Sequence, residues 1–250
     1  MATKFIQDYT VSRFSKVNAR SRPLEVIRTE SNLLWDYQRK ETRCSWLELA
    51  GGGAPTCDLL LQEGALGKNF LGVDLDLSIV TGCKTKYADL CTAGMAHFHH
   101  GDLLAMVRGY SPVVQDVGVL VYDTQQGLPH RNLDNPDDEL VRAVTDLIQF
   151  GKKQHKELGE FLLVINVTQQ RASVDNCNRW PLLLAQKLVE AKVLLPEQVE
   201  QVRRNPDCLV GKYPCSKAGS MLFSLIRFGF GQVLCEEGQN PLGLQGSSEK

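Results

Sequence analysis

The sequence lacks any hydrophobic segment long enough to cross a membrane. No apolar run approaches the roughly 18 residues that a membrane span requires. The opening stretch, MATKFIQDYTVSRFSKVNARSR, also contains no apolar block of the kind found in secretory signals. These absences argue against a helical membrane protein. We expect a cytoplasmic protein in a reducing, intracellular compartment, with no membrane partner.

Metal-binding and disulfide patterns are also missing. None of the eight cysteines belongs to a CxxC pair, and the closest two, Cys208 and Cys215, have six residues between them. A zinc site needs convergent ligands, whereas the alternating HFHH of residues 97–100 directs its histidines to different faces of a strand. We therefore expect no bound metal, and we expect reduced cysteines that act as small core hydrophobes.

Charge of one sign is not in excess either. The 28 Lys and Arg residues nearly balance the 29 Asp and Glu residues, which gives a net charge of −1. This balance argues against a protein coated in basic charge for non-specific binding of nucleic acid. Residues 1–43 differ, because they carry nine basic and five acidic side chains. This segment is predicted to be a helix packed across a sheet edge or, as the alternative, a lid or polyanion contact.

What the chain does contain is the composition of an ordinary globular protein, with 43% hydrophobic and 23% charged residues. Its length of 250 residues suits one full α/β domain. We expect an N-terminal helical extension over residues 1–43, one domain over residues 44–238, and a disordered polar tail over residues 239–250.

Short, nearly continuous apolar segments alternate with helical patterns along the domain. Such strands are typical of a mostly parallel, doubly wound sheet with helices on both faces, which is a three-layer α/β sandwich. Strands are predicted over residues 45–49, 69–76, 97–102, 115–123 and 161–168. Helices are predicted from Pro55, from Leu77, from the capping segment 134–139 with Pro136 in its first turn, and over residues 180–193 and 196–204. Residues 221–228 and 231–238 are predicted to form a C-terminal antiparallel strand pair.

Acidic residues follow four of the predicted parallel strands. The first strand ends with Glu48 and the loop AGGGA of residues 50–54, and the next three end with Asp74, Asp102 and Asp123. In a doubly wound sheet, ligands bind at the carboxyl ends of the strands, near the point where strand order reverses. Glycines let the backbone approach a ligand closely. An acid after the second strand can hold ribose hydroxyls, and an acid after the third can accept a hydrogen bond from an exocyclic amine.

This order of motifs resembles the class I S-adenosylmethionine-dependent methyltransferases, a family with a Rossmann-like, seven-stranded fold. The resemblance covers about residues 45–168, where ELAGGGA keeps the acid and central glycine of the first family motif but has Ala50 and Ala54 in the outer glycine positions. LGVDLD and HHGDLL match the ribose and adenine motifs, and VLVYDTQQ stands in the place of the fourth motif. The resemblance implies S-adenosyl-L-methionine as the cofactor. The cofactor-binding residues that it implies are Glu48, Ala50, Gly51, Gly52, Gly53, Asp74, Leu75, Asp102 and Leu103.

Two other interpretations remain open. A nicotinamide-binding Rossmann domain prefers GxGxxG after its first strand, but Ala54, Pro55 and Thr56 follow the glycines here, so the third glycine is missing. Glu48 also suits a positively charged sulfonium better than a pyrophosphate. The other interpretation is a catalytically silent methyltransferase fold that acts as a binding or partner subunit, because the first and fourth motifs depart from the family pattern.

The methyl acceptor is not identified by a family motif. The Asp/Asn-Pro-Pro-aromatic element of amino-methylating DNA enzymes is replaced by Asp123-Thr124-Gln125-Gln126, which disfavours that chemistry. The nucleophilic cysteine of cytosine C5 enzymes has no counterpart in this loop, because the one Pro-Cys dipeptide is Pro214-Cys215. The lysine expected after the fifth strand of ribose 2′-O-methyltransferases is also missing.

The fourth and fifth predicted strands both end in Thr-Gln-Gln, at residues 124–126 and 168–170. In the expected fold these loops are neighbours, and glutamine amides both donate and accept hydrogen bonds, so such a rim could read a nucleobase edge. A coincidental repeat is the alternative. We expect Asp123 to be catalytic and nucleic acid to be slightly favoured over protein or a small molecule as the acceptor. The residues expected to face the acceptor are Gln125, Gln126 and Gln169.

Overall fold

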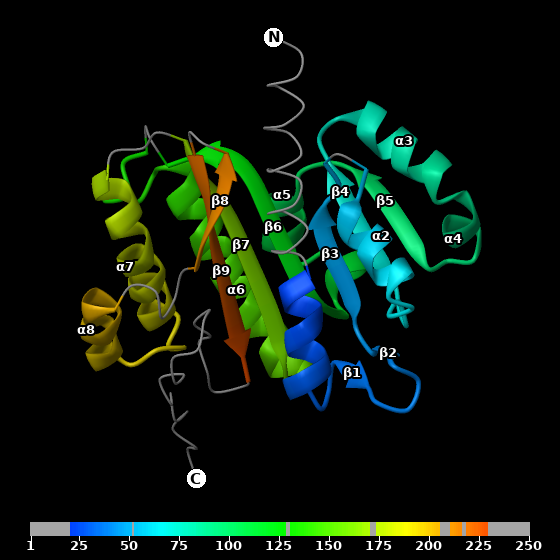
Figure 1. Ribbon diagram of the computed structural model, residues 1–250, viewed down its shortest axis with the longest axis horizontal. Coiled ribbons are helices and arrows are strands. Elements are labelled where there is room, and N and C mark those ends of the chain that lie inside the picture. The colour runs from blue at the N-terminus through cyan, green and yellow to red at the C-terminus, as the bar shows by residue number, and fades with distance from the viewer. Residues whose placement is uncertain are drawn as a thin grey trace.

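A seven-stranded sheet forms the centre of the molecule (Figure 1). The computed structural model describes residues 21–51, 53–128, 131–170, 174–205, 211–216 and 219–229. In sheet order, the strands are β5 (Ala96–His100), β4 (Phe70–Asp74), β3 (Ser45–Leu49), β6 (Val117–Gly127), β7 (Phe161–Gln170), β9 (Gly219–Phe228) and β8 (Gly211–Ser216). The first five are parallel, and β9 runs antiparallel to both β7 and β8. The predicted α/β class is therefore confirmed, including the antiparallel pair contributed by the C-terminal part of the chain.

Helices cover both faces of this sheet (Figure 1). They comprise residues 21–30, α2 (Pro55–Gln62), α3 (Leu77–Lys86), α4 (Ala88–Thr92), α5 (Leu103–Arg108), α6 (Glu139–Leu158), α7 (Val174–Glu190), α8 (Pro196–Arg204) and the 3₁₀ turn η1 (Pro112–Val114). Helix 21–30, α2 and α3 contribute to one apolar cluster, and α5, α6 and α7 contribute to another. A small ribbon of β1 (Trp35–Asp36) and β2 (Glu41–Thr42) links helix 21–30 to the sheet. The layers are those of a three-layer sandwich.

The strands alternate their buried side chains between the two clusters. Along β7, Leu162 and Val164 belong to the cluster under helix 21–30, and Leu163 and Ile165 belong to the cluster under α6. All four are fully buried, which explains why this strand reads as a continuous apolar segment. The same alternation determines which face each polar residue near a strand end occupies.

Aspartates cap three of the helices that follow the strands. Asp76, Asp102 and Asp138 accept hydrogen bonds from the backbone N–H two residues later, at 2.8, 2.9 and 2.9 Å. The last cap corrects the predicted start of α6, because Pro136 precedes the helix and does not lie in its first turn. Asn135 closes a separate turn by accepting from the N–H of residue 137 at 3.0 Å, so the helix begins only after Asp138.

Strand β9 has a partner that the sequence analysis does not predict. Along one edge it pairs with β7 over its whole length, and on the other edge β8 pairs with residues 219–223. Strand β8 precedes β9 closely in the chain, and consecutive strands of this kind pair as hairpins. Residues 231–238 and the predicted tail, residues 239–250, lie outside the described residues.

Helix α7 also begins earlier than predicted, at Val174 instead of Trp180, and it includes Pro181 in its interior. Proline is tolerated in the first turn of a helix, so the predicted start at Trp180 would have placed Pro181 where it costs little. In the structure, Trp180 is fully buried and its ring N–H donates to the Ser224 hydroxyl at 3.3 Å. We attribute the continuous helix to this packing, which offsets the backbone hydrogen bond that Pro181 removes.

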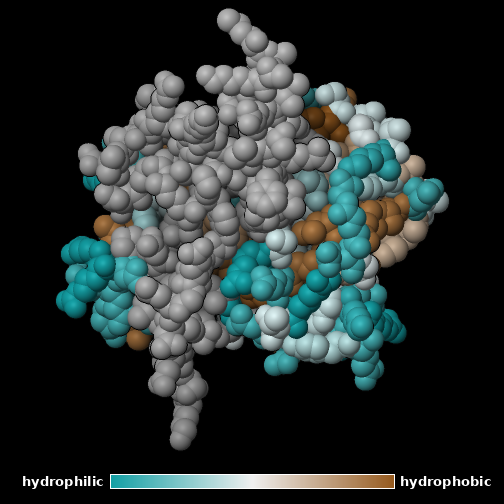
Figure 2. Space-filling view, viewed as in Figure 1, coloured by the Kyte–Doolittle hydropathy of each residue, from teal (hydrophilic) through white to brown (hydrophobic). Residues whose placement is uncertain are grey.

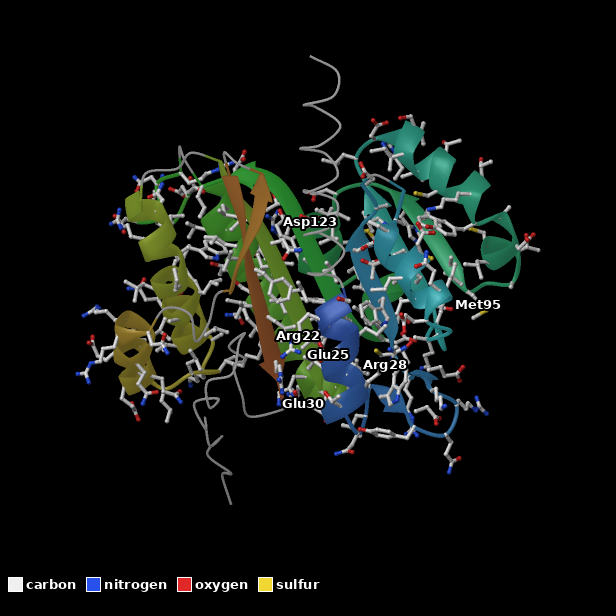
Figure 3. The ribbon with its side chains drawn as sticks, in the orientation of Figure 1. Arg22, Glu25, Arg28, Glu30, Met95 and Asp123 are labelled. Carbon is white, nitrogen blue, oxygen red and sulfur yellow. The ribbon has the colours of Figure 1, made fainter. Side chains whose placement is uncertain are left out.

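Helix 21–30 lies on a face of the sheet, which corrects the prediction that it packs across a sheet edge. Leu24, Val26 and Ile27 are almost completely buried in a cluster that includes side chains of β6, β7 and β9. Glu30, which Figure 3 labels, accepts two hydrogen bonds from the guanidinium of Arg227 on β9, one of them at 3.0 Å. Residues 1–20, the remainder of the predicted extension, lie outside the described residues. Over the ranges given above, no helix combines the length and apolar character needed to cross a membrane.

Candidate functional site

The order of the strands reverses between β3 and β6, two neighbouring strands in the interior of the sheet. From β3 the chain moves outward through β4 and β5, and it then returns to β6 and β7 on the other side of β3. In open α/β sheets, ligands bind at such a reversal, beyond the carboxyl ends of the strands. Glu48, Asp74 and Asp102 lie at or just after these ends. Asp123 lies within β6, which continues to Gly127, but the register of β3 and β6 places it level with the end of β3, so the four predicted acids lie near one another.

Glu48 and Asp123 leave the sheet on the face that helix 21–30 covers. They occupy the alternate positions shared with Trp46 on β3 and Val121 on β6, which belong to the cluster under that helix. Glu48 is 3% exposed, whereas Asp123 is only partly buried. The site therefore has one deeply buried acid on β3 and a more accessible one on β6.

The loop after β3 brings the glycine motif against Asp74. Ala50 is fully buried and donates its N–H to a carbonyl of β4 at 2.9 Å. A Cβ added to Gly51 would lie 3.8 Å from Oδ2 of Asp74, so a longer side chain at this position would fill the space beside that carboxylate. Gly53 has a φ of +95°, in the left-handed region that favours glycine. Gly52 lies outside the described residues.

Two side chains at the end of α3 hold the far end of this loop. The Tyr87 hydroxyl lies 2.9 Å from the carbonyl oxygen of Gly53, 3.0 Å from that of Ala54 and 2.8 Å from Oδ1 of Asp58. Lys86 donates to the Gly53 carbonyl at 3.0 Å and to Asp58 at 2.5 Å. These contacts stabilise a turn that is strained, since Ala54 has a left-handed φ of 51°.

The surroundings of Tyr87 favour the protonated phenol, which can donate a hydrogen bond. Burial, followed by the hydrogen bond to Asp58, raises the pKa of Tyr87 far above its usual range. Sequence reasoning missed both Tyr87 and Lys86, which lie 34 and 33 residues beyond Gly53. No local pattern signals such a contact, because it depends on how α3 packs beside the loop.

At the end of β4, Asp74 uses one carboxylate oxygen to hold the chain and directs the other towards the glycine loop. Oδ1 accepts a hydrogen bond from the N–H of Asp76 at 2.8 Å, while Oδ2 is the atom nearest to a Cβ built at Gly51. The ring of His100 donates to the carbonyl of Leu75 at 3.0 Å, which fixes the residue after the acid. The Leu75 side chain is 71% exposed, so an apolar surface borders Asp74.

The two carboxylate oxygens of Asp102 also have different surroundings. Oδ1 caps α5, and Oδ2 has no hydrogen-bond partner within the described ranges. Leu103 is 1% exposed and packs in the cluster under α6, so only its backbone could meet a ligand. With Glu48 and Asp74, Asp102 gives this side of the edge a negative charge. Burial and then the charge of Glu48 raise the pKa of the nearby Cys57 thiol to about 12.

The two Thr-Gln-Gln segments are parts of strands, which corrects the prediction that they form loops. Residues 124–126 continue β6, and residues 168–170 continue β7, which pairs with β9 along that whole length. Asp123 pairs with Asn166, but residues 124–126 then oppose the single residue 167 in a bulge. The two tripeptides are therefore not in register with each other. The three predicted acceptor residues lie on these strands, and the structure describes only their backbones: Gln125, Gln126 and Gln169.

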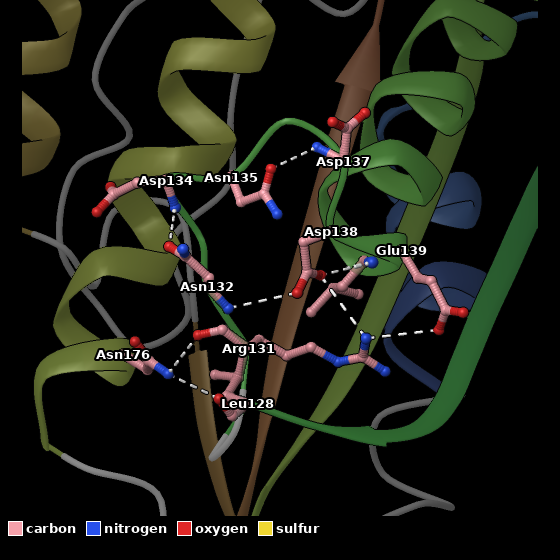
Figure 4. A network of polar contacts seen from close by, with 10 residues as sticks. Leu128, Arg131, Asn132, Asp134, Asn135, Asp137, Asp138, Glu139 and Asn176 are labelled. Atoms are coloured by element: carbon pink, nitrogen blue, oxygen red, sulfur yellow. Dashed lines mark hydrogen bonds and ion pairs between the residues drawn. The ribbon is translucent and has the colours of Figure 1, made fainter.

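The connection from β6 to α6 is anchored to α7 (Figure 4). The Asn176 amide donates to the carbonyl oxygens of Leu128 and Arg131 at 2.7 and 3.1 Å. The Arg131 guanidinium lies 3.8 Å from a carboxylate oxygen of Asp138 and 3.5 Å from one of Glu139. This network fixes the segment that follows Asp123. Among the residues that the structure describes, no three His, Cys, Asp or Glu side chains are grouped so that they could hold a metal ion.

The strand order and the single antiparallel strand within the sheet are those of a Rossmann-like α/β fold, the fold that the resemblance to class I methyltransferases predicts. TrmK from M. capricolum, solved with S-adenosyl-homocysteine, is 8% identical over 82% of this chain and 73% of its own, with a TM-score of 0.42. A candidate rRNA methylase from Clostridium thermocellum is 9% identical over 82% of this chain and 96% of its own, with a TM-score of 0.44.

A third solved structure, described as a possible exported protein from Bordetella parapertussis, is 13% identical with a TM-score of 0.39. The match covers 82% of this chain, which spans 66% of the length of that protein. No family model and no curated protein matches the chain.

Proposed function

We propose that this protein binds S-adenosyl-L-methionine and transfers its methyl group to an acceptor, with nucleic acid as the favoured acceptor class. The observation that carries the proposal is the approach of the glycine loop to Asp74 at the strand-order reversal, with Gly51 beside the carboxylate. Glu48 and Asp102 lie at the ends of the strands on either side of β4.

The donor side of the site suits a ligand that carries a positive charge and a ribose. When bound, S-adenosyl-L-methionine supplies a methyl group made electrophilic by its positively charged sulfur. The Glu48 carboxylate would favour that charge. Asp74 would accept charge-assisted hydrogen bonds from ribose hydroxyls through the oxygen beside Gly51, and Oδ2 of Asp102 would accept one from the adenine amine.

The remaining donor residues would act through their backbone or their apolar surface. Ala50, Gly51, Gly52, Gly53 and the backbone of Leu103 would line the ligand, since glycines allow close approach. The exposed side chain of Leu75 would pack against a flat base. Tyr87 and Lys86 would keep the loop in its strained conformation.

We assign the β6 and β7 side of the edge to the acceptor. Asp123 lies there, partly accessible, on the same face as Glu48, and would serve as the base for a proton released by the acceptor. Gln125, Gln126 and Gln169 follow on the same strands, and paired amides suit base edges. Such a site accelerates transfer by holding the acceptor and the methyl group in line.

Calorimetric titration with S-adenosylhomocysteine and NADH tests the donor site. We expect S-adenosylhomocysteine to bind and NADH not to bind. Asp74→Asn should weaken S-adenosylhomocysteine binding by about 1.5–3 kcal/mol, the range for hydrogen bonds to a charged group. Asp76→Asn is the matched control and should retain affinity, because asparagine also caps a helix.

The outcomes separate the candidate functions. Absence of S-adenosylhomocysteine binding would refute the donor site. Binding without transfer to any acceptor would support the silent partner subunit, and binding of NADH alone would favour a dehydrogenase-like site.

A further inference from the structure

Asn166 is buried near the functional edge without a hydrogen-bond partner for its side-chain oxygen. It lies on β7, is 1% exposed, and its Oδ1 accepts no hydrogen bond within the part of the chain that the structure describes. Burial of an amide oxygen in this state opposes folding, because the lost contact with water is not replaced. A native protein that keeps such a group requires an explanation, and functional sites are where local rules of this kind are broken.

Asn166 shares its face and its level in the sheet with Asp123. It follows Leu162 and Val164 at every second position, so it points to the same face as these side chains, which belong to the cluster under helix 21–30. The register of β6 and β7 pairs Asn166 directly with Asp123, which Figure 3 labels on the upper part of β6. The two side chains therefore leave neighbouring strands about 4.8 Å apart, on the same face as Glu48.

The chemistry of this pair selects a donor with two hydrogens. A carboxylate and an amide oxygen both accept hydrogen bonds, so a group held between them must donate to each. In a planar amino group the two N–H bonds diverge by about 120°, and N···O distances of about 2.9 Å then separate the two acceptors by roughly 5 Å. That separation matches the spacing of adjacent strands. A hydroxyl has only one hydrogen to donate, and a ring carbonyl has none.

We propose that Asn166 and Asp123 together bind the amino nitrogen that receives the methyl group, and that this nitrogen is the exocyclic amine of a nucleobase. The inference rests on the proposed function and specifies its acceptor. It replaces the sequence-based expectation against amino methylation, which depended on a missing element after β6. The second acceptor comes from β7, and no motif next to Asp123 reveals it.

Thermal unfolding of the ligand-free protein tests the role of Asn166 without an acceptor. Asn166→Leu keeps the number and branching of the side-chain heavy atoms and removes the unpaired amide oxygen, so the Tm should rise by about 2–4 °C. The matched control is Ser224→Ala on the neighbouring strand. Ser224 is fully buried but accepts a hydrogen bond from Trp180, so its loss should lower the Tm. A lower Tm for Asn166→Leu would show that Asn166 is a structural residue and would overturn the proposal.

Product analysis tests the acceptor atom. The full-length protein is incubated with deuteromethyl-labelled S-adenosylmethionine and random-sequence RNA and DNA, which are digested to nucleosides for mass spectrometry. We expect label on an exocyclic amine of cytosine, adenine or guanine. Asn166→Leu and Asn166→Ala should reduce the amount of this label at least tenfold, while their affinity for S-adenosylhomocysteine stays within about twofold of that of the unmodified protein. Ser224→Ala should retain labelling.

The two proposals fail in different ways. Label on a ring carbon, on a ribose oxygen or on a protein side chain would overturn the amine acceptor and leave the methyltransferase function intact. Absence of label in a protein that binds S-adenosylhomocysteine would also overturn it, in favour of the silent subunit. Failure to bind S-adenosylhomocysteine would overturn the proposed function itself.

Discussion

Tyr87→Phe removes one hydroxyl that links α3 to the end of the glycine loop. The phenol is 5% exposed and lies within 2.8–3.0 Å of three acceptors, the carbonyls of Gly53 and Ala54 and the carboxylate of Asp58. The aromatic ring stays, so its stacking on Phe98, with centroids 5.5 Å apart, should be retained. The variant therefore isolates the contribution of the hydroxyl.

The expected loss follows from the number and type of these bonds. One hydroxyl has one proton, so the three contacts share it and do not add. A hydrogen bond to a charged group contributes about 1.5–3 kcal/mol and one to a neutral group about 0.5–1.5 kcal/mol. Asp58 is partly exposed and keeps its bond to Lys86, so we expect a loss of about 1–2 kcal/mol. That corresponds to a fall in Tm of roughly 2–8 °C for a chain of this size.

The same change should weaken donor binding. If the bond stabilises the binding-competent loop, its loss lowers the population of that loop and raises the apparent Kd for S-adenosylhomocysteine, by up to about thirtyfold. Calorimetry measures the Kd and a thermal melt measures stability. Tyr110→Phe is the matched control, because it removes a hydroxyl bonded to Glu157, away from the loop. An unchanged Kd in Tyr87→Phe, or an equal change in both variants, would refute the reasoning.

Three further outcomes can be checked. Glu30→Gln should destabilise the protein by about 1–3 kcal/mol in urea unfolding, because it leaves Arg227 charged and buried. Replacing both residues with Leu should recover most of that loss. A double variant as unstable as the single one would contradict this. Gly72→Ala should lower the Tm strongly, since its Cβ would lie 2.5 Å from a ring carbon on β5. Cys57, with its pKa raised to about 12, should resist iodoacetamide at pH 8 while the half-buried Cys91 is labelled, as peptide mapping would reveal.

The strands and the acids at their ends were predictable because their signals are local. β3 and α8 have the bounds that the sequence predicts, and Asp74 ends its strand as expected. A buried parallel strand must be apolar throughout, and its end must turn at a polar residue, so a short window of sequence contains the information.

The features that sequence reasoning missed depend on pairing across the sheet. Whether residues 124–126 form a loop or continue a strand depends on how far β7 extends beside them, and β7 in turn is extended by its pairing with β9. Asn166 reads as an ordinary strand residue until its register with Asp123 is known. The contacts of Tyr87 with the glycine loop likewise require the packing of α3 to be known first.

The bond between Glu30 and Arg227 has a consequence for the order of folding during synthesis. The two residues are 197 positions apart, so helix 21–30 emerges from the ribosome long before the strand it covers. Its apolar side chains then lack the surface contributed by β9 until that strand has been made. Contacts of such long separation slow folding, and an early, unpartnered apolar helix is a target for chaperones. Removal of β9 would thus also remove part of the surface on which helix 21–30 packs, although that helix lies near the other end of the sequence.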